Sequence, residues 1–147
     1  MQFQRSRPLS LLAAAALSLA LVGCGGGSSE PEAPAPSFAG TYLVTLNKTR
    51  DCGTGISQTA EVIQTVTQSG RAITLVSNAV TLQGNVDPDN AGFSTSTQST
   101  SGNITTTTTT IYRTSSTPGL YGVGFAVVAA GDGGRCEIAY SGQAVLQ

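Results

Sequence analysis

From residue 39 onward, the chain contains short stretches in which apolar and polar residues alternate, separated by turn residues. A period of two predicts β-strands with one buried face, because successive side chains of a strand point to opposite sides of the sheet. Tyr42, Val44 and Leu46 give the clearest example, on one face of a first strand. Further strands are expected near Val62–Val66, Ile73–Leu75, Val80–Val86, Phe93–Ser99, Ile104–Arg113, Leu120–Ala129 and Cys136–Leu146.

The connections between these stretches are short and rich in turn residues. Asp87-Pro88-Asp89-Asn90, for example, combines a proline that presets φ with side chains that bond back to the backbone. Short connections favour antiparallel neighbours in chain order, and no helical period is sustained among the predicted strands. The sequence therefore predicts an all-β domain, an eight-stranded antiparallel up-and-down barrel, with a β-sandwich as the alternative.

The first 23 residues have a different pattern. Arg5 and Arg7 precede Leu9–Val22, a run rich in leucine and alanine, as in a secretory signal. The run is too short for a transmembrane anchor, which needs about 20 apolar residues. The other alternative is an ordinary cleaved signal that Cys24 follows by chance.

The end of this run, Leu21-Val22-Gly23-Cys24, resembles the lipobox of bacterial lipoproteins. The resemblance implies that residues 1–23 are removed and that Cys24 carries the lipid that holds the protein on a membrane. Gly25 stands where lipoproteins kept in the inner membrane often have Asp, which favours the outer membrane of a cell envelope. Residues 24–37 then form a Gly- and Pro-rich tether, and residues 38–147 form the β domain.

Two further cysteines are expected to form a disulfide bond. In an eight-stranded barrel the first and last strands are antiparallel neighbours, so the end of one meets the start of the other at the same rim. Cys52 follows the first strand and Cys136 begins the last. Export would place both in an oxidising compartment, although two free thiols are the alternative.

A second resemblance concerns the start of the domain. Gly40-Thr41-Tyr42 is similar to the Gly-x-Trp that opens lipocalin barrels and to the Gly-Thr-Trp of avidin-type barrels. Tyrosine replaces tryptophan here, and the Thr-Asp-Tyr block of lipocalins is absent. The match covers three residues and implies architecture only.

Composition argues against several functions. The chain has no histidine and one lysine, so general bases and nucleophiles are scarce and no enzyme activity or cofactor is expected. Asp87, Asp89 and Asn90 lack the distant bidentate Glu of a calcium loop, so a turn is expected there and no metal site. A nucleic-acid ligand would need clustered basic residues. Those after residue 23 are scattered: Lys48, Arg50, Arg71, Arg113 and Arg135.

Two strands have unusual faces. Residues 94–117 include the unbroken run Thr105–Thr110. A solvent-facing hairpin is expected there, and the alternatives are a functional array of hydroxyl groups or O-glycosylation. The strand Leu120–Ala129 is apolar on both faces, so one face is expected to contact a partner. The predicted interaction surface consists of Tyr121, Val123, Phe125 and Val127.

Two functions follow. The first is a lipid-anchored binding or accessory protein of the cell envelope, acting through contact with an envelope protein or with itself. The alternative is a lipocalin-like carrier of a small apolar ligand, held where small residues leave space inside the barrel. The candidates for such positions are Gly84, Gly122, Gly124, Ala126, Gly142 and Ala144.

Overall fold

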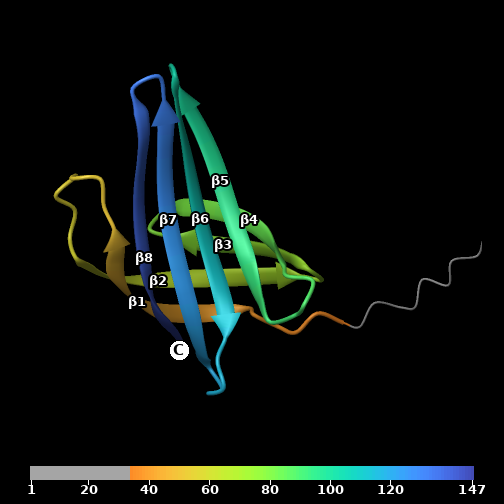
Figure 1. The fold of residues 1–147 in the computed structure, drawn as a ribbon. Coiled ribbons are helices and arrows are strands. Elements are labelled where there is room, and N and C mark those ends of the chain that lie inside the picture. The colour runs from red at the N-terminus through yellow and green to blue at the C-terminus, as the bar shows by residue number, and fades with distance from the viewer. Residues whose placement is uncertain (1–33) are drawn as a thin grey trace, which may run out of the picture. The chain divides into compact units, whose positions relative to one another are not determined.

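A computed structural model describes residues 34–147, which form one closed barrel of eight antiparallel strands (Figure 1). The strands pair in chain order, and β1 also pairs with β8, which closes the barrel. The predicted all-β barrel is confirmed, in place of the sandwich. The predicted signal, the lipidated Cys24 and the tether up to residue 33 lie outside the described residues. The strands are β1 (Gly40–Arg50), β2 (Thr59–Ser69), β3 (Ala72–Ser77), β4 (Val80–Val86), β5 (Gly92–Ser101), β6 (Ile104–Thr114), β7 (Leu120–Gly131) and β8 (Gly134–Leu146).

The strands cross steeply around the core. In Figure 1, β1–β4 lie across the view, while β5–β8 run up it. Two inward-facing glycines allow neighbouring backbones to approach at the crossings. A Cβ atom added to Gly84 would lie 1.8 Å from the Ser94 carbonyl oxygen, and one added to Gly142 would lie 1.9 Å from that of Thr45. Both positions therefore require glycine for close backbone contact.

Replacing Gly142 with alanine should destabilise the barrel, because the new methyl group would force β1 and β8 apart. We expect a loss of about 1–3 kcal/mol in the free energy of unfolding, measured by urea denaturation. Gly124→Ala is the matched control, since a Cβ atom at Gly124 would meet no atom within 4 Å. Equal stability of the two variants would contradict this role of Gly142.

Aromatic side chains fill one end of the barrel, which we call the closed end. Phe38 lies just before β1 and packs edge-on against Phe93, with ring centroids 5.4 Å apart. Phe93 in turn stacks on Tyr112 at 4.6 Å. The Tyr42 hydroxyl donates to the Phe38 carbonyl oxygen at 2.7 Å, and the Phe38 amide donates to Oε1 of Gln68 at 2.7 Å. The segment before β1 thus plugs the closed end.

This packing predicts a loss of stability at alkaline pH. Burial raises the pKa of Tyr42 and Tyr112 well above their ordinary value of 10.0, and the neighbouring tyrosines add to the effect. Because the folded protein holds these protons more tightly, their contribution to stability is complete below about pH 10 and is lost as the pH rises above it. Tyrosinate absorbance, followed together with the denaturation midpoint, measures this. If all four tyrosines ionised at the ordinary pKa in the folded protein, the expectation would be wrong.

Candidate ligand-binding cavity

The other half of the barrel contains a cavity of about 420 Å³. It reaches the open rim, where Ile56 and Val80 are 46% and 49% exposed. Its volume lies within the range of about 300–1,000 Å³ that is typical of small-molecule sites. The apolar lining consists of Leu46, Ile56, Ala60, Val62, Val80, Leu82, Phe125, Val127 and Ile138, and Tyr140 adds a ring.

The inward faces of the strands explain why a space remains here. At the closed end these faces carry rings, whereas nearer the open rim they carry shorter side chains such as Ala60, Val62 and Thr108. Phe125 and Tyr140 pair across β7 and β8 and form one wall, with ring centroids 6.3 Å apart. The result is an apolar hollow with a closed floor and one mouth.

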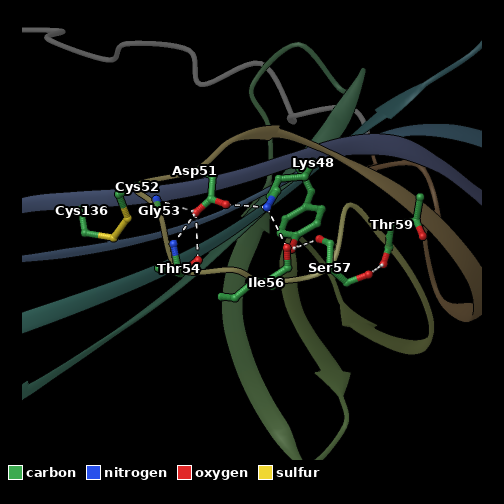
Figure 2. Close-up of polar contacts among 10 residues, drawn as sticks. Lys48, Asp51, Cys52, Gly53, Thr54, Ile56, Ser57, Thr59 and Cys136 are labelled. Atoms are coloured by element: carbon green, nitrogen blue, oxygen red, sulfur yellow. Dashed lines mark hydrogen bonds and ion pairs between the residues drawn. A yellow bond between two sulfur atoms is a disulfide. The ribbon is translucent and has the colours of Figure 1, made fainter.

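The loop between β1 and β2 forms part of the mouth, and polar contacts hold it in place (Figure 2). The Lys48 ammonium donates to Asp51 Oδ2 at 2.5 Å and to the Ile56 carbonyl oxygen at 2.7 Å. The Tyr140 hydroxyl donates to the carbonyl oxygen of Ser57 at 2.9 Å. Ile56 is therefore fixed at the edge of the cavity.

Asp51 organises the start of the same loop. Its Oδ1 accepts hydrogen bonds from the backbone amides of Gly53 and Thr54, both at 3.1 Å, and from the Thr54 hydroxyl at 2.8 Å. The hydrogen bond from Lys48, followed by those from Thr54, holds the pKa of this carboxyl well below its usual range. The carboxylate is therefore charged at neutral pH and is engaged within the loop.

The predicted disulfide bond joins this loop to β8. Cys52 and Cys136 are bonded, with Cα atoms 5.6 Å apart and a sequence separation of 84. Figure 2 shows the bond beside the contacts of Asp51. The end of the first strand and the start of the last thus meet at one rim, as predicted.

The residues of the predicted interaction surface lie inside the barrel. Val123 is buried, Tyr121 packs in the aromatic cluster, and Phe125 and Val127 line the cavity. The four side chains therefore do not form an outer contact surface, which corrects the prediction. Because both faces of β7 are apolar, the alternation alone did not show which face turns inward.

Two other expectations also change. The cavity lining includes none of the small residues that were expected to leave space, and Gly84 and Gly142 instead mark close backbone contacts. The threonine-rich hairpin is not wholly solvent-facing, since Thr95 and Thr110 are buried. The alternation also places Gln64 on the same face as Val62 and Val66, but the sequence alone indicated no role for this buried polar residue.

An exposed apolar stripe crosses the outer wall. Ile63 of β2 pairs with Leu43 of β1, which pairs with Val145 of β8, and Val145 pairs with Leu120 of β7. Ile63 is 52% exposed and Val145 is 45% exposed. We call these four apolar residues the outer stripe.

The part of the chain that the structure describes contains no group of three or more His, Cys, Asp or Glu residues suited to a metal ion. Within residues 34–147 there is also no helix long and apolar enough to cross a bilayer. The chain matches no protein-family model, no curated protein and no solved structure.

Proposed function

We propose that the barrel binds a small apolar ligand in its cavity and acts as a carrier or receptor for that molecule at the cell envelope. The observation that carries the proposal is the apolar hollow of about 420 Å³, open at one rim and closed by rings at the other. A small barrel can instead be filled by its own side chains, and a filled interior would contain no cavity that opens to solvent.

The contacts around the mouth support a role in binding. The disulfide, the Lys48–Asp51 ion pair and the Tyr140 hydroxyl hold the rim loop in one arrangement. A site shaped before the ligand arrives loses less conformational entropy on binding. The apolar walls then supply affinity in proportion to the ligand surface removed from water.

The proposed location rests on the N-terminal sequence. The likeness of Leu21-Val22-Gly23-Cys24 to a lipobox supports a lipid anchor, and the anchor would keep the carrier on a membrane surface. Mass spectrometry of the N-terminus of the protein from cell envelopes tests this part separately. A protein that retains residues 1–23, or that lacks acyl chains, would remove the anchor from the proposal.

Titration with N-phenyl-1-naphthylamine, a neutral dye that fluoresces in apolar surroundings, tests the binding site. We expect saturable binding of one dye molecule to each molecule of exported protein, with competition by other small apolar compounds. Lipids that co-purify with the protein, identified by mass spectrometry, would indicate the natural ligand. A dye signal that rises without saturation, or no signal, would contradict the proposal.

Contact with an envelope protein or self-association stays a second prediction, now placed on the outer stripe. Charges at Ile63 and Val145, as in I63K/V145K, should abolish such contact, because both side chains are exposed and a lysine there would be costly to bury. Sedimentation and pull-down from envelope extracts measure the effect. An unchanged association state and an unchanged set of captured proteins would count against the stripe.

A further inference from the structure

Two polar side chains at the inner end of the cavity have unused hydrogen-bonding capacity. Gln64 is 3% exposed, and its Oε1 accepts a hydrogen bond from the Tyr112 hydroxyl at 2.5 Å. No hydrogen bond joins its Nε2 to any other residue in the range 34–147. The Thr110 hydroxyl is fully buried and also has no partner there. Both residues line the cavity.

These groups come from opposite strands of the barrel, β2 and β6, and Tyr112 links them. Thr110 and Tyr112 are successive inward-facing residues of β6, and Tyr112 is the residue that holds the Gln64 amide. Because the Gln64 oxygen is engaged by Tyr112, its amino group is the part left for another partner. The lining of the cavity's inner end thus includes an amide donor from β2 and a threonine from β6, on opposite sides of the barrel.

An unpaired buried hydroxyl is costly, since the group gives up its hydrogen bonds to water without replacement. Valine has nearly the same shape as threonine and would avoid that cost at Thr110. The neighbouring Thr95, by contrast, has a partner, because its hydroxyl donates to the Thr110 carbonyl oxygen at 3.4 Å. The unpaired hydroxyl therefore stands out among the residues that line the cavity.

The cavity also selects against charge. None of its fifteen lining residues is charged. The nearest ammonium on the inner face of β1, that of Lys48, lies at the rim and is already bonded to Asp51 and to the Ile56 carbonyl oxygen. A carboxylate placed at the inner end would lose its hydration without gaining a counter-charge.

We propose that the ligand is a neutral, mainly apolar molecule with one terminal oxygen acceptor, an alcohol or a carbonyl, which enters first and is bound by Gln64 and Thr110. The Gln64 amino group donates to this oxygen, and the Thr110 hydroxyl donates to it or accepts from a ligand hydroxyl. The apolar remainder of the ligand then lies along Val62, Leu82 and Ile138 toward the mouth. This assignment rests on the proposed function and specifies its ligand class.

Competition against bound N-phenyl-1-naphthylamine tests the assignment with three compounds of equal chain length, namely 1-octanol, 1-chlorooctane and octanoate. We expect 1-octanol to compete about tenfold better than 1-chlorooctane, because only the alcohol forms the hydrogen bonds at the inner end. Octanoate should be the weakest competitor at neutral pH. Equal competition by the alcohol and the chloride, or stronger competition by octanoate, would overturn the assignment.

Two variants locate the selectivity. Thr110→Val should reduce the preference for the alcohol over the chloride several-fold, and Gln64→Leu should reduce it further. The preference is measured within each protein as the ratio of the two competition constants. The Thr110→Val protein should also be at least as stable as the wild type, because it loses an unpaired hydroxyl. A clear loss of stability in this variant would mean that the hydroxyl has a structural partner, and would overturn its role in binding. If the wild type binds no dye, the proposed function itself fails; if dye binds but the variants keep the full preference, only the assignment of the ligand class fails.

Discussion

Replacing Ala60 with tryptophan should abolish ligand binding and leave the barrel folded. Ala60 lies on β2 and lines the cavity, so an indole ring at this position would occupy the space that the ligand needs. We expect the affinity for N-phenyl-1-naphthylamine to fall by at least about tenfold. Filling an apolar void adds buried contacts, so stability should be maintained or slightly increased.

The matched control is Ala126→Trp. Ala126 lies on β7 between Phe125 and Val127, which both line the cavity, so its own side chain points to the outer surface. The chemical change is the same in both variants, but the control should bind the dye like the wild type. All proteins are purified in the same way, so dye taken up by any attached lipid or detergent is common to them and cancels. If both variants bound the dye equally well, the dye site would lie outside the cavity.

Removal of the disulfide should cause the largest loss of stability. The bond between Cys52 and Cys136 closes a long loop that contains the six strands β2 to β7. In the chain-entropy model, a cross-link over so long a segment stabilises the fold by about 4–5 kcal/mol, and native disulfides typically contribute 2–5 kcal/mol. The double variant C52A/C136A should therefore have a free energy of unfolding that is lower by about 4 kcal/mol, measured by urea denaturation with circular dichroism.

Chemical reduction provides the control for this expectation. The reduced wild type should match the double variant, since both lack the cross-link. Ligand affinity should fall as well, because the bond holds the loop that carries Ile56 to the start of β8. A loss of less than about 1 kcal/mol would show that the unfolded chain gains little freedom when the bond is removed. The bond would then not be a main source of the barrel's stability.

The sequence was sufficient for the architecture because the relevant signals are local. The alternation at Tyr42, Val44 and Leu46 specifies which face of β1 is buried, and all three residues lie in the core. The cysteine pairing followed once strand order was assumed, since chain order alone places the end of β1 beside the start of β8. These inferences needed no knowledge of side-chain packing.

The cavity could not be predicted in the same way. Its volume depends on which inward residues meet across the barrel, and this is set by strand crossing rather than by spacing in the sequence. Gly142 illustrates the difficulty, because a small residue suggested open space whereas the β1 backbone occupies that space. Phe38 is the opposite case. It adjoins a Pro-rich segment that suggested no buried contacts, yet its ring packs into the closed end of the barrel, and the unfilled space lies at the other end. The sequence also did not show which face of β7 turns inward, because a strand with two apolar faces has no polar side to mark the solvent.

The most direct test of the cavity as a binding site is to locate the bound dye by nuclear magnetic resonance. With methyl-labelled protein, we expect intermolecular Overhauser effects from N-phenyl-1-naphthylamine to Val62, Leu82, Val127 and Ile138, which line the cavity from four strands. Effects confined to exposed methyl groups of the outer wall, such as those of Ile63 and Val145, would contradict binding in the cavity.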